Sequence, residues 1–177
     1  MNILLSTKKL LYSLFLALSF CCTLSINKLS AQKYKNADIK SIPVFFPVDK
    51  KGFSRISSKF GYRWHPIKKK KIFHKGIDLA AKAGSRVYAS AYGIVFESSY
   101  SKSYGNYIII QHRNGYRTKY AHLSKRFVNK YQRVQQGSVI GSVGSTGHST
   151  GPHLHFELIR GNKNIDPYAF WMKAINR

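Results

Sequence analysis

The segment Gly151-Pro152-His153-Leu154-His155-Phe156-Glu157-Leu158 (residues 151–158) follows a loop rich in Gly, Ser and Thr, and its pattern predicts a strand. Side chains two positions apart share one face of a strand, so His153 and His155 project together from backbone positions about 7 Å apart. Two neighbouring imidazoles suit a metal site, with one as ligand and the other beside the substrate. Two ordinary surface histidines would give the same pattern, so the choice depends on ligands elsewhere in the chain.

The remaining sequence predicts an all-β domain. Its 177 residues are enough for one domain with its own core, and an aromatic content of 14% favours strands over helices. Short apolar or alternating runs broken by glycine predict strands over residues 86–90, 93–98, 106–112, 115–122, 138–143 and 153–160. Asn114-Gly115 is typical of a hairpin turn, and Pro167 opens a predicted short helix over residues 167–175. We expect an antiparallel β-sandwich or open-barrel-like sheet with few short helices.

The N-terminus predicts an exported protein. Residues 1–9 include two lysines and no acidic residue, and residues 10–24 are almost wholly apolar. This run is typical of a signal peptide, because a membrane span needs about 20 apolar residues. Small residues before Gln32 provide a cleavage site and predict a signal peptide over residues 1–31. The alternatives are an uncleaved anchor and a lipoprotein signal, the second disfavoured by the bulky Phe20.

The composition restricts the partners and the chemistry. Thirty basic residues against six acidic ones give a formal charge of +24, and loss of residues 1–31 removes three of these lysines. Such a charge favours a polyanionic partner, and export makes an anionic cell wall or outer surface the expected one rather than nucleic acid. Both cysteines, Cys21 and Cys22, lie in the leader. A metal site in the mature chain, which should have no transmembrane span, must therefore use His and Asp or Glu.

A second cluster, His74-Lys75-Gly76-Ile77-Asp78, contains an imidazole and a carboxylate four positions apart. On a straight strand these two would lie about 13 Å apart, which is too far to share an ion. A bend at Lys75-Gly76 would bring them together, and glycine permits such a bend. The simpler alternative is that Asp78 pairs with one of the many lysines.

Counted together, His74, Asp78 and one of His153 and His155 provide two imidazoles and one carboxylate. Three protein ligands with a fourth position for water is the arrangement of catalytic zinc sites, whereas structural sites have four protein ligands. Zn²⁺ lowers the pKa of its water to about 7. The histidine that is not a ligand could then transfer a proton.

Three further observations complete the candidate set. His122, at the predicted end of its strand, is a second candidate proton carrier or oxyanion stabiliser. Glu157 shares the face of His153 and His155, where it could orient a ligand imidazole or face the solvent. The other histidines have no evident partner and are interpreted as surface or structural residues: His65, His112 and His148.

This series of motifs resembles the lysostaphin/LytM-type zinc endopeptidases of bacterial cell walls. The matching runs are FGYRWHP (60–66), FHKGIDLAA (73–81), GNY (105–107), YAHLS (120–124), GSTG (144–147) and STGPHLHFE (149–157). The resemblance implies an antiparallel β fold with a groove across one sheet, Zn²⁺ held by His74, Asp78 and His155, and His122 with His153 as the catalytic pair. It also implies hydrolysis of peptide bonds in the stem peptides or cross-bridges of peptidoglycan.

The expected organisation is a signal peptide over 1–31, a lead-in segment over 32–52 and a zinc metallopeptidase domain over 53–177, in the periplasm or secreted. Some members of this family lack zinc ligands and act as non-catalytic wall-binding regulators or amidase activators. Here all five positions are filled, which favours an active enzyme. A third reading, a cationic exported protein acting on membranes or nucleic acid, would give an activity that follows salt and ignores zinc.

Overall fold

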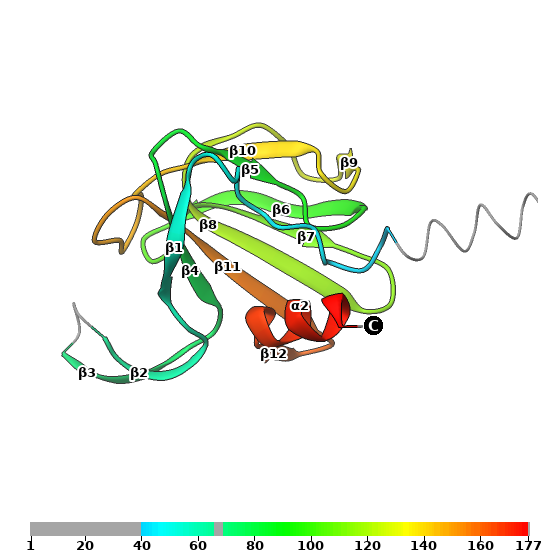
Figure 1. The fold of residues 1–177 in the computed structure, drawn as a ribbon. Helices are drawn as coiled ribbons and strands as arrows, with labels where there is room; N and C mark the ends of the chain where they lie inside the picture. The colour runs from blue at the N-terminus through cyan, green and yellow to red at the C-terminus, as the bar shows by residue number, and fades with distance from the viewer. Residues whose placement is uncertain (1–39, 66–68, 177) are drawn as a thin grey trace, which may run out of the picture. The chain divides into compact units, whose positions relative to one another are not determined.

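The computed structural model describes residues 40–65 and 69–176 (Figure 1). The predicted signal peptide, with Cys21 and Cys22, and the first part of the lead-in lie outside the described residues. Residues 40–176 belong to one compact unit. No helix among the described residues is long and apolar enough to cross a membrane.

The described residues form an antiparallel β fold with one short helix, as predicted. The elements are β1 (Phe53–Ser58), β2 (Gly61–His65), β3 (Lys70–His74), β4 (Ile77–Ala81), β5 (Arg86–Tyr88), β6 (Gly93–Ser101), β7 (Gly105–Gln111), β8 (Tyr116–Arg126), β9 (Arg133–Val134), β10 (Val139–Val143), β11 (His153–Arg160), β12 (Lys163–Ile165) and α2 (Pro167–Ile175). The main sheet has the order β1-β4-β11-β8-β7-β6-β9, and β10 joins β8 to β5. β2 and β3 form a separate two-stranded hairpin, which extends away from the main sheet in Figure 1.

Strand β11 lies inside the sheet between β4 and β8, and its two faces have different roles. Leu154, Phe156 and Leu158 are fully buried in the hydrophobic core. The side chains of His153, His155 and Glu157 alternate with them on the opposite face. Burial of each large apolar side chain contributes about 1.5–3 kcal/mol, so the core face holds the polar face in place.

The helix and the lead-in cover one end of this core. Asp166 caps α2 by accepting hydrogen bonds from the backbone N–H of Tyr168 (2.9 Å) and Ala169 (3.4 Å). Trp171 stacks on Phe156 with ring centroids 5.4 Å apart, and its indole N–H donates to the carbonyl of Pro43 (3.1 Å). Residues 40–52 therefore contribute to the folded unit.

Most predicted boundaries agree with the structure. The Asn114-Gly115 turn joins β7 to β8, with φ angles of 59° and 73° that suit these two residue types. One prediction was wrong in extent, because β8 does not end at His122 but continues to Arg126.

The continuation of β8 depends on a local irregularity at His122, where φ is +61°. Before it, β8 pairs with β11 through residues up to Ala121; after it, residues from Leu123 onward pair with β10. The strand therefore changes partners at His122. A sequence pattern of period two does not reveal such a kink. The sequence therefore predicts that the strand ends at His122.

His112 belongs to a buried polar chain, in agreement with its interpretation as structural. Its Nδ1 donates to the carbonyl of Tyr92 (2.9 Å), and its Nε2 lies 2.7 Å from the Thr118 hydroxyl. Thr118 in turn contacts the Tyr120 hydroxyl (2.9 Å), which accepts from the backbone N–H of Ser90 (2.8 Å). Burial lowers the pKa of His112 from 6.5 to about 4, although the hydrogen bond to Tyr92 opposes the shift.

This shift predicts an acid-sensitive fold. Because the folded state binds fewer protons than the unfolded state, the His112 contribution is complete above pH 6.5 and is lost as the pH falls towards 4. The free energy of unfolding should fall by about 3 kcal/mol over that window from this residue alone. Urea denaturation of the wild type and His112→Gln at pH 7 and pH 4.5 measures it. Equal losses in the two proteins would contradict the prediction.

Candidate active site

The end of β3 and the start of β4 bring His74 and Asp78 together through the predicted bend. β3 ends at His74 and β4 begins at Ile77. At the bend a Cβ on Gly76 would lie 2.2 Å from the carbonyl oxygen of Phe156, so only glycine allows β11 this close. The result is a distance of 3.1 Å between His74 Nε2 and Asp78 Oδ1.

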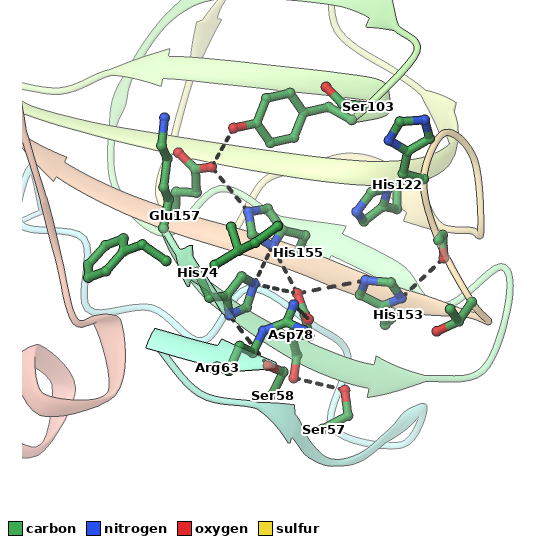
Figure 2. Close-up of a pocket in the computed structure, with 17 residues that line it drawn as sticks. Ser57, Ser58, Arg63, His74, Asp78, Ser103, His122, His153, His155 and Glu157 are labelled. Carbon is green, nitrogen blue, oxygen red and sulfur yellow. Dashed lines mark hydrogen bonds and ion pairs between the residues drawn. The ribbon is translucent and has the colours of Figure 1, made fainter. Parts of the chain in front are cut away.

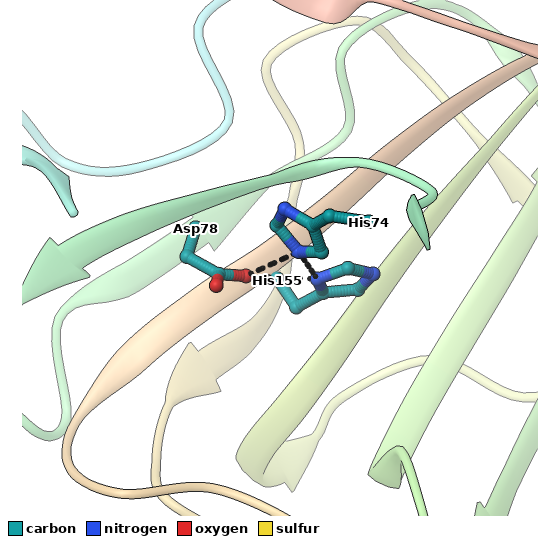
Figure 3. A group of neighbouring side chains, drawn as sticks. All are labelled: His74, Asp78 and His155. Atoms are coloured by element: carbon teal, nitrogen blue, oxygen red, sulfur yellow. Dashed lines mark hydrogen bonds and ion pairs between the residues drawn. The ribbon is translucent and has the colours of Figure 1, made fainter. Parts of the chain in front are cut away.

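The pairing of β4 with β11 adds the third side chain. Asp78 lies directly opposite His155 in the register of the two strands. His155 Nδ1 is 2.8 Å from Asp78 Oδ1 and 3.0 Å from His74 Nε2. One candidate ligand atom from each of the three residues lies within 4.8 Å of the others, and each residue is buried (Figure 3).

The hydrogen bonds around the two imidazoles test whether this set fits a metal. His74 Nδ1 lies 2.8 Å from the carbonyl oxygen of Lys59, and His155 Nε2 lies 3.1 Å from Glu157 Oε1. Because an imidazole nitrogen must carry its proton to donate to these acceptors, the nitrogens that face Asp78 carry lone pairs in the neutral rings. Two lone pairs and a carboxylate directed at one point repel one another unless a cation lies between them. The donor set therefore fits Zn²⁺ with an open coordination position.

The charge states agree with a cation-binding cluster. Burial alone would raise the pKa of Asp78, but hydrogen bonds and attraction from His155 and His74 hold it well below its ordinary value, so the carboxylate is ionised. Burial would lower the pKa of His155, yet its hydrogen bonds to Asp78 and Glu157 raise it overall. A proton and a metal ion compete for the same lone pair, so metal binding here would release a proton.

Glu157 is buried and accepts a hydrogen bond from His155, so of the two alternatives it contacts the imidazole and does not face solvent. Its Oε1 also accepts from the Tyr104 hydroxyl (2.9 Å). Its Oε2 accepts from the Asn164 amide (3.1 Å) and lies 3.5 Å from Lys119 Nζ. Burial would raise the pKa of Glu157, but His155 and Lys119 lower it to about 2. Sequence reasoning missed Tyr104, Asn164 and Lys119, because no pattern connects them to position 157.

His122 and His153 lie side by side next to this cluster, with ring centroids 4.7 Å apart (Figure 2). Nδ1 of His122 donates to the carbonyl of Thr146 (2.7 Å), and Nδ1 of His153 donates to that of Gly151 (2.8 Å). Nε2 of each ring is then unprotonated in the neutral form, and Nε2 of His153 lies 3.7 Å from Asp78 Oδ1. Burial lowers the pKa of His122 to about 4, despite the bond to Thr146. At neutral pH His122 is therefore a base without a proton on Nε2.

A groove of about 440 Å³ contains all five of these residues. Its other lining residues come from β1, the β2–β3 hairpin and the bend after it, the loop between β6 and β7, the loop before β11, and β11 itself: Ser57, Ser58, Arg63, Ile72, Phe73, Lys75, Ser103, Tyr104, His148, Ser149, Thr150 and Glu157. His148 is exposed, as expected for a surface residue. It also lines this groove, which the sequence did not indicate. His65 belongs to β2, and its side chain lies outside the described residues.

An antiparallel β fold with a His, Asp, His donor set and two further histidines in one groove defines a zinc metallopeptidase type of site. The model of Peptidase family M23 matches residues 72–167, which include all five residues, and the chain belongs to this family. A crystal structure of a zinc-containing peptidase from Vibrio cholerae has a TM-score of 0.64 and 40% identity, covering 70% of this chain and 39% of that one. The cofactor is zinc, and the cluster of His74, Asp78 and His155 is compatible with binding it.

Two relatives of known name show similar levels of identity. DD-carboxypeptidase/endopeptidase Mpg of Neisseria meningitidis is 47% identical over 124 residues, which is 70% of this chain and 29% of the relative. Peptidoglycan DD-endopeptidase ShyA of Vibrio cholerae is 49% identical over 115 residues, which is 64% of this chain and 26% of the relative. The chain thus spans less than a third of the length of these relatives.

The contacts of Glu157 predict an effect on metal affinity. Glu157→Gln removes the charge that orients His155, so the affinity for Zn²⁺ should fall about 10- to 100-fold while the fold is retained. Competition with a chromophoric chelator measures the affinity, and circular dichroism monitors the fold. Asp166→Asn is the matched control, because it removes a carboxylate at the helix cap and should leave the affinity unchanged. An unaltered affinity in Glu157→Gln would refute this role.

Proposed function

We propose that this protein is an exported, zinc-dependent endopeptidase of bacterial peptidoglycan. The observation that carries the proposal is the convergence of His74, Asp78, His155, His122 and His153 in one groove. Family membership and the names of the relatives support the same reaction.

In this proposal His74, Asp78 and His155 hold Zn²⁺, and His122 and His153 are the catalytic pair. A bound zinc ion supplies Lewis acidity, which makes a carbonyl carbon more electrophilic and a water molecule more acidic. His122 has an unprotonated Nε2, so it takes the proton of the attacking water and later gives it to the leaving amine. His153 is the second member of the catalytic pair. Its Nε2 lies 3.7 Å from Asp78 Oδ1, at the edge of the proposed metal centre, where it can contact the attacking water or the substrate. The carbonyls of Thr146 and Gly151 keep the two rings in the required tautomer.

The proposed substrate is a stem peptide or cross-bridge of peptidoglycan, and the bond that joins two D-centred residues is favoured. The names of the two relatives include the DD specificity, and the two matches cover 70% and 64% of this chain. The formal charge of +24 supports attraction to an anionic wall or outer surface.

The proposed organisation is a signal peptide over 1–31, a lead-in over 32–52 and a catalytic domain over 53–177, with action in the periplasm or outside the cell. The apolar leader supports export, and the family match at 72–167 falls within the proposed catalytic domain. An exported protein would not meet nucleic acid as a natural partner.

Removal of the metal provides the first test. A chelator should abolish clearing of purified peptidoglycan in a zymogram, and added Zn²⁺ should restore it. The reason is that the side chains of the groove do not supply a Lewis acid when zinc is removed. Equal clearing with and without the chelator would refute metal catalysis and leave the reading of a cationic protein that acts through charge.

Substitution of the catalytic pair separates an enzyme from a non-catalytic wall-binding regulator. His122→Ala and His153→Ala should each lower kcat about 100- to 10,000-fold, the usual size of general acid–base catalysis. Zinc content, measured by mass spectrometry, should be unchanged because neither residue is a proposed ligand. His148→Ala, at the same groove, is the control and should retain most activity. Full biological function in His153→Ala would favour the regulator.

A further inference from the structure

Arg63 has a position in the groove that the proposed mechanism does not use. It lies on β2, where successive side chains alternate between the two faces of the hairpin. Its neighbours Tyr62 and Trp64 are 73% and 65% exposed on the outer face. Arg63 and its cross-strand partner Ile72 line the groove instead, and Figure 2 shows the guanidinium beside Asp78.

The hydrogen-bonding capacity of this guanidinium is mostly unfilled. A guanidinium has five N–H donors. The described residues offer Arg63 a single polar side-chain contact, 3.4 Å between Nη2 and Asp78 Oδ2, which is long for a charge-assisted hydrogen bond. Its Nε is buried and has no hydrogen-bond partner among the described residues. Buried polar groups are normally paired, so these donors point to a ligand that completes them.

The charge balance of the groove indicates the sign of that ligand. The lining residues include two permanent cations, Arg63 and Lys75, and two acids, Asp78 and Glu157. Glu157 is already paired with Lys119 and His155 behind the metal centre. Asp78 would share its charge with a divalent ion, which leaves the groove with an excess of positive charge. Such a groove favours an anionic substrate.

The location of Arg63 indicates where on the substrate the negative charge must lie. Its Nη2 lies 3.4 Å from Oδ2 of Asp78, a proposed zinc ligand, so the guanidinium lies beside the proposed metal centre. An α-carboxylate on the residue that supplies the leaving amine is two bonds from the scissile nitrogen. The planar guanidinium suits a carboxylate, because two parallel N–H groups match its two oxygens.

We propose that Arg63 is a substrate-binding residue that recognises a free carboxylate on the residue immediately after the scissile bond. The inference rests on the proposed peptidase function and narrows its substrate class. The enzyme would cleave bonds whose leaving amine belongs to an α-amino acid with an ionised carboxylate, whether that residue is the chain end or part of a cross-link. An amide at the same place would lack the charge that Arg63 binds.

The test compares two forms of one substrate, a cross-linked muropeptide dimer with free carboxylates and the same dimer after conversion of its carboxylates to amides. The wild type should cleave the free acid with a kcat/KM about 10- to 100-fold higher. Arg63→Gln should lose this preference by slowing the acid while leaving the amide rate unchanged. Arg63→Lys should retain part of the preference, because it keeps the charge but not the paired donors.

Controls distinguish substrate binding from support of the metal site. Lys71→Gln removes one positive charge from the outer face of the same hairpin, where Lys71 lies opposite Trp64, and should keep the full preference. Zinc content should be the same in Arg63→Gln and the wild type. Calorimetry should show that the carboxylate-bearing cleavage product binds the wild type more tightly than it binds Arg63→Gln.

Each contrary result has a distinct meaning. Equal cleavage of the acid and the amide by the wild type overturns the carboxylate site but supports the endopeptidase. Equal slowing of both substrates in Arg63→Gln, or loss of zinc, shows that Arg63 only positions Asp78 and also overturns the proposal. Failure of the wild type to cleave either form overturns the peptidase function and this inference with it.

Discussion

The pairing of β4 with β11 is the constraint on which the site depends. It places Asp78 opposite His155, and the bend at Gly76 returns His74 to the same point. The strand pairing and the bend depend on each other, because a side chain at position 76 would collide with the backbone of β11. The backbone hydrogen bonds of a buried sheet thus set a cluster of three ligand atoms within a few ångströms, before any metal binds.

The same strand connects stability with chemistry. The core face of β11 packs against the aromatic residues of the fold, including Trp171, and its opposite face carries His153, His155 and Glu157. Because the strand is held by its apolar side chains, its polar side chains have little freedom. The outward hydrogen bonds to Lys59, Glu157, Thr146 and Gly151 then determine which nitrogen of each imidazole faces the groove.

The electrostatics of the groove follow from this arrangement. The carboxylates are held by histidines, a lysine and hydrogen bonds, whereas within the described part of the chain the guanidinium of Arg63 has one long polar side-chain contact. A divalent ion would add further positive charge. The high net charge of the chain therefore has a local counterpart in the groove, where it bears on the substrate rather than on general attraction to a surface.

Much of the organisation could be predicted from the residues alone. Alternation and turn residues indicated the antiparallel fold, the hairpin at Asn114-Gly115 and the C-terminal helix, because these depend on neighbours in the chain. The five candidate site residues were named from spacing and resemblance, and the structure gathers them in one groove; their individual roles stay predictions. Tertiary structure alone decided that β8 continues through His122, that Glu157 is held by Tyr104, Asn164 and Lys119, and that Arg63 points at Asp78. Those features depend on hydrogen bonds and charges between residues far apart in sequence, and no local pattern encodes them.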